Sequence, residues 1–294
     1  MQEGLLTLDE LYKKCIKLIA ESSETPALDA RIIAQNVLKI ELNEFILHSQ
    51  DIVSLNDAQR ILDLVQQRAQ GVPVAYLIGQ RGFYEDVFTV NQNTLIPRAD
   101  TEILVELAIE LGLHQQKDLQ ILDLCCGTGC IGISVAKALV KQGKNIKLVL
   151  SDISKEALKV CNENCERILG DIGLKEKVKY KVVCANLFEG VKEEAFDLVL
   201  SNPPYIASSV IETLEPQVKK EPRLALDGGE DGLEIIRMIT EQAPKYMKEG
   251  SYLLMEIGYD QGDAVKELFE GSGFHQVEVK KDLGGRDRVV KGAF

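Results

Sequence analysis

From residue 119 onward, short apolar runs alternate with longer stretches in which apolar residues recur at helical spacing. The runs have the length of buried strands, and the clearest helices begin after Gly129 and at Ser154. Such alternation is typical of a parallel sheet with helices on both faces, so the sequence predicts an α/β fold. The predicted strands, of which the last two form an antiparallel pair, are 119–123, 147–151, 178–184, 196–200, 251–258, 274–279 and 288–291.

The sequence Asn202-Pro203-Pro204-Tyr205 follows directly after the apolar run that ends at Leu200. Open α/β sheets bind ligands beyond the carboxyl ends of their strands, so Asn202 is expected at a binding site. The prolines restrict the backbone and supply no N–H. The Asn202 side-chain carbonyl and the Pro203 backbone carbonyl can accept hydrogen bonds from one NH₂ group, while the Tyr205 ring lies on the plane of an amide or aromatic amine. The alternative is a proline-stiffened strand end without chemistry.

A glycine-rich turn follows the first predicted strand and opens the helix behind it. Gly127, Gly129 and Gly132 have the spacing of dinucleotide-binding turns. Asp152 ends the next strand, where a carboxylate can accept hydrogen bonds from both hydroxyls of a ribose. The alternative for Asp152 is a charge at the start of a helix. Both an NAD-dependent oxidoreductase and an enzyme that uses S-adenosylmethionine have such a turn.

Two observations favour S-adenosylmethionine over NAD. Asp123 lies just before the glycines, where its carboxylate can receive the ammonium of an amino-acid moiety, which S-adenosylmethionine carries and NAD lacks. No residues suited to hydride transfer are apparent either, because the histidines are His48, His114 and His275. The sequence therefore predicts S-adenosylmethionine as the cofactor.

Residues 1–75 are predicted to form a small helical bundle. Thr7 and Glu10 have the spacing of a capping box, and apolar residues recur on one face behind them. The bundle carries no candidate catalytic group, so it is either structural or holds a partner. Residues 76–95 contain Val, Tyr, Phe and Ile between glycines and are expected to form a hairpin that links the bundle to a second domain at 96–294.

The entry to the second domain carries Arg98, followed by Asp100 and Thr101. Either Asp100 or Thr101 is placed to cap the helix that runs on through Leu113. Arg98 is either a solvated charge or a contact to substrate.

The overall composition excludes several classes of function. A net charge of −12 argues against a general phosphate-binding surface for nucleic acid and leaves room for a basic protein partner. No apolar run reaches membrane-spanning length and no signal peptide is apparent, so no membrane association is expected. The seven cysteines include no Cys-x-x-Cys pair, so we expect reduced thiols in the cytoplasm and no metal site.

Three segments together resemble the HemK/PrmC family of glutamine N5-methyltransferases, which act on peptide chain release factors. They are the glycine loop at 123–129, Asn-Pro-Pro-Tyr-Ile at 202–206, and Glu-Pro-Arg-Leu-Ala-Leu-Asp-Gly-Gly-Glu-Asp-Gly-Leu at 221–233. The third is the most specific, because adenine N6-methyltransferases share Asn-Pro-Pro-Tyr. The resemblance covers essentially the whole chain. It implies a class I, Rossmann-like methyltransferase domain with a seven-stranded mixed sheet, preceded by a helical domain that binds the release factor, in a monomer.

The activity that the resemblance implies is transfer of the methyl group of S-adenosylmethionine to a glutamine side-chain amide nitrogen. The glutamine would be that of the Gly-Gly-Gln motif in class I release factors. Alternative substrates are a ribosomal-protein glutamine and an exocyclic adenine amine, although the acidic chain and the lack of a basic recognition insert argue against adenine. The sequence also leaves open an NAD oxidoreductase and a non-catalytic module that binds a translation factor.

The family's motifs assign roles to residues of this sequence. The expected cofactor-binding residues are Asp123, Cys125, Cys126, Gly127, Thr128, Gly129, Asp152, Asn186, Leu187 and Asn202. The expected substrate-binding residues are Arg98, Asn202, Pro203, Pro204 and Tyr205, of which Asn202, Pro203 and Tyr205 are also expected to be catalytic. This chain departs from the family at Cys125, where glycine is common, at Ala99, where proline is common, and at Asn186, where aspartate is more usual.

Overall fold

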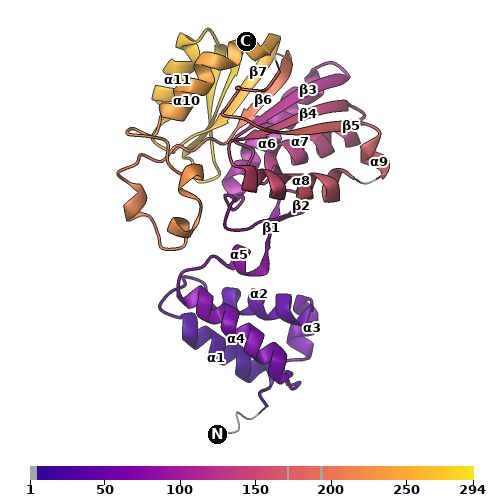
Figure 1. The fold of residues 1–294 in the computed structure, drawn as a ribbon, viewed down its shortest axis with the longest axis vertical. Helices are drawn as coiled ribbons and strands as arrows, with labels where there is room; N and C mark the ends of the chain where they lie inside the picture. Colours follow the sequence, from indigo (N-terminus) through magenta and orange to yellow (C-terminus); the bar gives the residue numbers. More distant parts are fainter. Residues whose placement is uncertain (1–4, 171, 193–194) are drawn as a thin grey trace. The chain divides into compact units, whose positions relative to one another are not determined.

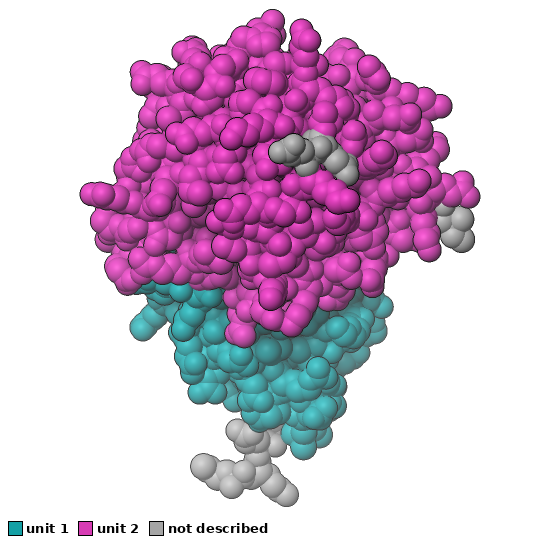
Figure 2. Space-filling model, turned by 45° about the horizontal axis from the view of Figure 1, so that its top comes forward, with its two compact units in different colours: residues 1–79, 215–220 teal, residues 80–214, 221–294 magenta. Residues whose placement is uncertain are grey.

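The computed structural model of the 294-residue chain describes residues 5–170, 172–192 and 195–294 (Figure 1). The chain divides into two compact units, which Figure 2 colours separately. The first comprises Met1–Gly79 and Glu215–Lys220, and the second comprises Gln80–Leu214 and Glu221–Phe294. Across the described ranges, no helix combines the length and the apolar character needed to cross a membrane.

The first unit is a helical bundle, and its predicted capping box is confirmed. Glu10 N donates to Thr7 Oγ1 at 3.2 Å, and Thr7 N donates to Glu10 Oε2 at 3.0 Å. Buried apolar side chains form the core, where the Arg68 guanidinium also pairs with the Asp29 carboxylate at 2.6 Å. The helices are α1 (Leu8–Ile19), α2 (Pro26–Leu38), α3 (Leu42–Leu47), α4 (Leu55–Ala69) and α5 (Val74–Ile78).

The hairpin after the bundle is shorter than the sequence predicts. Its antiparallel strands are β1 (Gln80–Phe83) and β2 (Asp86–Thr89), and the residues just before them form α5. Val74 and Leu77 explain the difference, because they lie three residues apart and both pack against the core of the bundle. Burial of one helical face therefore outweighs the β propensity of this stretch.

The second unit is built on a seven-stranded mixed sheet, as the resemblance implied. The strand order is β5-β4-β3-β6-β7-β9-β8. The first five strands in this order run parallel, and β9 runs antiparallel to both of its neighbours. The strands are β3 (Asp118–Leu124), β4 (Asn145–Asp152), β5 (Val178–Cys184), β6 (Phe196–Ser201), β7 (Met247–Glu256), β8 (His275–Lys281) and β9 (Asp287–Ala293).

Helices cover both faces of this sheet (Figure 1). Successive strand residues point to opposite faces, and Ile121 and Leu122 of β3 accordingly belong to separate apolar clusters. Because both faces are covered, all six residues of β6 are buried. One cluster includes α6 (Glu102–His114), α7 (Cys130–Lys141) and α8 (Lys155–Leu169), and the other includes α10 (Glu234–Gln242) and α11 (Gly262–Gly271).

The sheet changes its direction of growth between β3 and β6. From β3 the chain proceeds to β4 and β5 on one side, and later to β6 and β7 on the other. The carboxyl ends of β3 and β6 are therefore neighbours: Leu124 pairs with Ser201, and Ser201 Oγ donates to Leu124 O at 3.0 Å. The helices that follow these strands lie on opposite faces, and such a switch point opens a crevice for ligands.

Candidate functional site

The glycine loop joins β3 to α7 through backbone in the left-handed region. Cys125, Gly127 and Gly129 have φ values of 56°, 53° and 79°. Cys126 N donates to Ser151 O at 3.0 Å, which fastens the loop to the end of β4. The left-handed φ of Cys125 explains why a glycine suits this position, since glycine adopts this conformation without steric cost.

Asp152 ends β4 with both carboxylate oxygens turned toward backbone N–H groups. Gly127 N donates to Oδ2 at 2.9 Å, and Ser154 N donates to Oδ1 at 2.8 Å. Burial raises the pKa of Asp152, and these backbone bonds oppose that rise. Each carboxylate oxygen has a second lone pair, so Asp152 still has acceptor capacity for hydroxyls in the cavity that it lines.

Asp123 lies behind the glycine loop and does not line the cavity. Its side chain is fully buried, its Oδ2 accepts from Gly132 N at 2.8 Å, and Oδ1 has no hydrogen-bond partner in the described chain. Burial is the main reason that its pKa rises to about 7. The expected contact with a ligand ammonium stays a prediction, while Asp123 anchors the first turn of α7 through Gly132 N.

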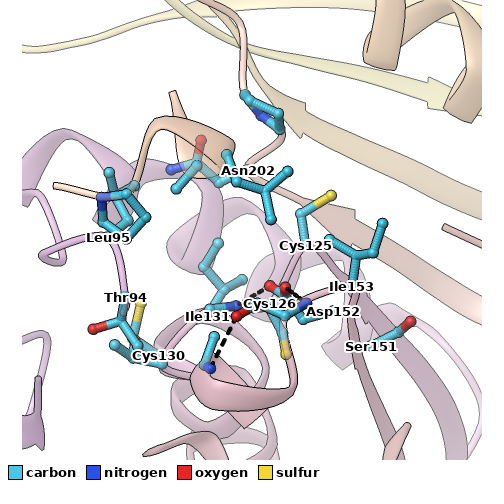
Figure 3. A pocket seen from close by; sticks show the side chains of 18 of the residues that line it. Thr94, Leu95, Cys125, Cys126, Cys130, Ile131, Ser151, Asp152, Ile153 and Asn202 are labelled. Carbon is cyan, nitrogen blue, oxygen red and sulfur yellow. Dashed lines mark hydrogen bonds between the residues drawn. The ribbon is translucent and has the colours of Figure 1, made fainter. Parts of the chain in front are cut away.

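The cavity lies beyond the carboxyl ends of β3, β4 and β6 (Figure 3). Asn202 and Leu95 flank one side of it, and Asp152 and Ile153 flank the other (Figure 3). It brings together most of the expected site residues, namely Arg98, Cys125, Cys126, Gly127, Thr128, Asp152, Asn186, Leu187, Asn202 and Pro204. Gly129, Pro203 and Tyr205 are not among the residues that line it.

Gly129 has a packing role. A Cβ at this position would lie 2.8 Å from Cys161 Sγ and 3.0 Å from Ile133 Cδ1. The glycine therefore allows the loop to approach α8 and α7 closely, and this approach supports the cavity from behind.

The Tyr205 side chain is not among the residues that line the cavity, and its expected contact with the substrate stays a prediction. Its ring packs in the apolar cluster under α10 and α11, and its hydroxyl donates to Glu256 Oε1 at 3.1 Å. Desolvation raises the pKa of this phenol above its usual value, and Glu256 raises it further. The structure therefore places Tyr205 as a support for the Asn-Pro-Pro-Tyr loop.

Thr101 is the N-cap residue of α6, as its position suggested, but its side chain makes no capping hydrogen bond. The Thr101 hydroxyl instead accepts from Asn202 Nδ2 at 3.4 Å, and the residue lines the cavity while 2% exposed. Residues 99–101 form a 3-10 helix just before α6.

Arg98 lines the cavity and forms an ion pair, so it is not simply a solvated charge, and its contact with substrate stays a prediction. Its guanidinium contacts Glu221, whose side chain is 1% exposed. The other oxygen of Glu221 accepts from Ile96 N at 2.9 Å. Glu221 thereby ties the entry loop to the segment that begins the third motif.

That third motif, at 221–233, forms a second layer against the Asn-Pro-Pro-Tyr loop. Ile206 N donates to Leu226 O at 3.0 Å, and Gly228 N donates back to Ile206 O at 2.8 Å. A Cβ at Gly228 would lie 2.8 Å from Pro204 O, and one at Gly232 would lie 2.4 Å from Tyr205 O. The two glycines therefore allow backbone to pack directly on backbone.

The sequence interpretation missed several residues around the cavity. Thr101, Glu221 and Glu256 are polar yet 5% exposed or less, and each contacts an expected site residue. For Glu256 a signal was available, because an acid ends the apolar run of β7 in the same way as Asp123 and Asp152 follow theirs. The loop residues Asn93, Thr94 and Leu95, which also line the cavity, showed no comparable signal.

The cysteines at the cavity are unsuited to nucleophilic chemistry. Burial raises the pKa of Cys125, Cys126 and Cys130 to about 12, so these thiols stay protonated near neutral pH. All seven cysteines of the chain are free thiols.

Comparison with known proteins identifies both parts of the chain. Residues 10–79 match the family described as PrmC N-terminal domain, and residues 100–248 match the family described as Methyltransferase small domain. Among solved structures, the hMettl16 catalytic domain, in complex with MAT2A 3′UTR hairpin 1, has a TM-score of 0.55 and 14% identity. That match covers 90% of this chain and 91% of the other, and at this identity it shows the fold alone.

Relatives that align with most of the chain identify the family more specifically. The Release factor glutamine methyltransferase of Caulobacter vibrioides is 35% identical over 271 residues, which are 92% of this chain and 90% of the relative. The protein of the same description from Agrobacterium fabrum is 34% identical over 285 residues, or 96% of this chain and 95% of the relative. The chain therefore belongs to the release factor glutamine methyltransferase family.

Proposed function

We propose that this protein transfers the methyl group of S-adenosylmethionine to the side-chain amide nitrogen, N5, of the glutamine in the Gly-Gly-Gln motif of class I peptide chain release factors. The observation that carries the proposal is the placement of Asn202 at the switch point between β3 and β6, with its amide NH₂ directed to Thr101. This arrangement leaves the Asn202 carbonyl oxygen available to a substrate NH₂ group.

The residues around the cavity fit S-adenosylmethionine, which supplies an electrophilic methyl group on a sulfonium. Asp152 has the acceptor capacity for two ribose hydroxyls, and we assign Asn186 and Leu187 to the adenine end. Cys125, Cys126, Thr128 and Gly127 line the part that we assign to the methionine end. No heavy atom lies within 4 Å of a Cβ built on Gly127, so its backbone is open to close approach by a ligand.

The Asn-Pro-Pro-Tyr loop addresses the weak nucleophilicity of an amide nitrogen, whose lone pair is delocalised into the carbonyl. We propose that Asn202 Oδ1 and the Pro203 carbonyl accept the two N–H groups of the glutamine and favour a pyramidal nitrogen. These acceptors also stabilise positive charge that develops on nitrogen during transfer. Pro204 and Arg98, which line the cavity, are proposed to contact the substrate loop.

We further propose a division of labour along the chain. Residues 1–75 hold the release factor, 76–95 are a linker, and 96–294 carry the chemistry. The chain's net charge of −12 suits a basic protein substrate. We also propose that the protein is a monomer and acts in the cytoplasm.

The test is mass spectrometry of a class I release factor incubated with the protein and S-adenosylmethionine. One methyl group on the Gly-Gly-Gln glutamine is expected, and the matched substrate with Gly-Gly-Glu should be rejected by roughly 10⁴-fold, since an ionised carboxylate has no N–H for the two acceptors. Asn202→Ala should lower kcat by about 10² to 10³. Because Asn202 also borders the cofactor part of the cavity, calorimetry must report S-adenosylmethionine binding to the same variant. Methylation of the glutamate loop, or transfer to adenine or to a ribosomal-protein glutamine in preference to the release factor, would contradict the proposal.

A further inference from the structure

Glu221 is a buried acid whose two carboxylate oxygens both bind the loop that carries Arg98. Its side chain is 1% exposed. Oε2 accepts from Ile96 N at 2.9 Å, and Oε1 accepts from the Arg98 guanidinium. Burial of a carboxylate is costly unless donors satisfy it. These two bonds therefore hold both groups of the loop against Glu221.

The bundle contains another pair of an arginine and a buried carboxylate, and the comparison shows how the pair at the cavity differs. The side chains of Arg68 and Asp29 are 5% and 10% exposed, so both belong to the core. At the cavity only the acid is buried, because the Arg98 side chain is 39% exposed. Its bond to Glu221 uses Nη2, and no other acceptor within the described ranges binds its guanidinium. A guanidinium carries five N–H donors, so Arg98 is held at one nitrogen and has donors left for a ligand.

The loop that carries Arg98 reaches the cavity on the side of Asn202. Leu95, three residues before Arg98, lies on that side, whereas Asp152 lies on the other (Figure 3). Arg98 O also accepts from Thr101 N at 3.1 Å, and the Thr101 hydroxyl contacts Asn202. This connection associates Arg98 with the part of the cavity that we assign to the substrate.

Arg98 is the one cation among the described residues that line the cavity. Pro97 and Pro222, the sequence neighbours of Arg98 and Glu221, also line the cavity and have no N–H. The guanidinium therefore supplies hydrogen-bond donors that these prolines lack. A substrate loop with two glycines offers backbone carbonyl oxygens that no side chain shields, and such oxygens are acceptors for a guanidinium.

We propose that Glu221 is a positioning residue that fixes the Arg98 guanidinium, so that its remaining N–H groups bind backbone carbonyl oxygens of the substrate loop next to the reacting glutamine. The inference rests on the proposed function and deepens it, because it names the group that holds Arg98 in place. A guanidinium is planar, so fixing one nitrogen restricts the directions of the others. Loss of the Glu221 charge releases the guanidinium and weakens substrate binding, while the Asn202 acceptor and the cofactor part of the cavity are unaffected.

Substitutions of Arg98 test its contact with the substrate. Arg98→Ala should raise the KM for a Gly-Gly-Gln peptide by about tenfold to a hundredfold, with kcat within about threefold and the S-adenosylmethionine dissociation constant within about twofold. Arg98→Lys keeps the charge but not the planar fork, so its KM should stay raised by at least about fivefold. An unchanged KM in Arg98→Ala, or a wild-type KM in Arg98→Lys, overturns the proposal.

Substitution of Glu221 tests the positioning. Glu221→Gln keeps the size and an oxygen for Ile96 N but loses the charge that holds Arg98, so the peptide KM should rise about tenfold. Added to Arg98→Ala, the same substitution should raise KM by less than about twofold more, because both act through one contact. Glu212→Gln is the matched control and should leave KM unchanged, since Glu212 is an exposed acid that pairs with Arg223 at 3.6 Å. Losses that multiply would mean that Glu221 acts without Arg98, and the proposal would be wrong.

A readout independent of turnover is the Nε–H resonance of Arg98 in ¹⁵N-labelled protein. Addition of the Gly-Gly-Gln peptide should shift it in the wild type, and at the same peptide concentration the shift should be lost in Glu221→Gln. If the wild type methylates no glutamine while the peptide shifts this resonance in a manner that requires Glu221, the proposed function fails and the positioning stands. A wild-type resonance that does not respond to the peptide overturns the inference, whether or not methyl transfer occurs.

Discussion

A buried acid at the end of β3 carries a charge that the fold does not compensate. Asp123 has one backbone donor, Gly132 N, and one oxygen without a partner in the described chain. A Cβ on Gly132 would lie 2.9 Å from the Asp123 carboxylate, so glycine is required for α7 to start against this group. Asp123 therefore links the strand to the helix that follows the glycine loop.

The raised pKa of Asp123 predicts a specific dependence of stability on pH. Below about pH 4 the carboxyl is protonated in both the folded and the unfolded chain. As pH rises toward about 7, the unfolded carboxyl ionises first, so the free energy of unfolding falls, by about 1.4 kcal/mol for each unit of pKa difference. Asp123→Asn has no such loss, and its stability relative to wild type should increase from about pH 4 to about pH 7 and then level off. Urea unfolding of both proteins at several pH values measures this difference, and a difference that does not vary with pH contradicts it.

The sequence predicts that polar residues at strand ends lie near the binding site, but it does not predict which of them line the cavity. Asp152 and Asn202 follow buried strands, and the structure places both at the cavity, as the position of ligands in α/β sheets suggests. Asp123 and Tyr205 occupy similar positions in the sequence but are not among the residues that line it. The placement of these two side chains depends on specific partners, because Asp123 accepts from Gly132 N and Tyr205 donates to Glu256. The sequence pattern does not reveal either pairing.

At the scale of elements, the segment 226–233 and the loop after β6 form one packed unit. Gln261, just before α11, joins them further: its Nε2 donates to Tyr205 O at 3.0 Å and to Gly232 O at 3.2 Å. Gly232 has a φ of 75°, which favours glycine even before its neighbours are considered. The segment at 221–233 therefore supports the Asn-Pro-Pro-Tyr loop through these contacts.

Gly232→Ala should disturb that support more than left-handed strain alone does. The added Cβ would lie 2.4 Å from Tyr205 O, so the backbone of the Asn-Pro-Pro-Tyr loop must shift at its Tyr205 end. We expect kcat to fall at least about tenfold, because small misplacements of reacting groups are costly, with cofactor affinity little changed. Gly285→Ala is the matched control, since Gly285 has a similar φ of 79° and no neighbour within 4 Å. Steady-state kinetics of both variants measure this difference. An equal fall in kcat in the two variants would mean that left-handed backbone strain alone causes the loss.

The elements themselves were largely predictable, because burial on both sheet faces makes a central strand such as β6 a continuous apolar run, and β-branched residues mark β5 at the edge. The β5 strand spans the residues predicted for it, and β6 extends them by one residue. α5 was not predictable, because its formation depends on packing against the bundle core. Segment 215–220 belongs to the first unit although it is distant from it in sequence, and no local pattern reveals such a placement.

At the scale of the whole molecule, the first unit is made of two separate stretches of chain. Residues Glu215–Lys220 lie within the second unit's sequence yet belong to the first unit, where a Cβ on Gly71 would contact Pro216 Cβ at 3.5 Å. Removal of residues 1–79 would therefore strip this segment of its packing. Surface substitutions in the first unit are the cleaner way to test its role.

The first unit carries exposed apolar side chains that its core does not use. They include Leu42, Ile46, Leu47, Ile52 and Leu55, and Ile46 and Leu47 of α3 are 64% and 77% exposed. Exposed apolar side chains of this kind are candidates for contact with a protein partner. If the unit holds the release factor, charges at these positions should weaken that contact without affecting the chemistry.

The double substitution Ile46→Glu with Leu47→Glu should therefore distinguish large from small substrates. We expect kcat/KM for the intact release factor to fall by roughly tenfold or more, since loss of a central apolar contact costs more than about 1 kcal/mol for each residue. A short Gly-Gly-Gln peptide offers the reacting glutamine but lacks the rest of the factor, so its kcat/KM should stay within about twofold, as should the affinity for S-adenosylmethionine. Leu283→Glu is the matched control, because Leu283 is an equally apolar, fully exposed residue in the turn between β8 and β9. An unchanged kcat/KM for the intact factor would leave these two residues without a part in binding, whereas an equal loss with the peptide would place the effect on the catalytic unit.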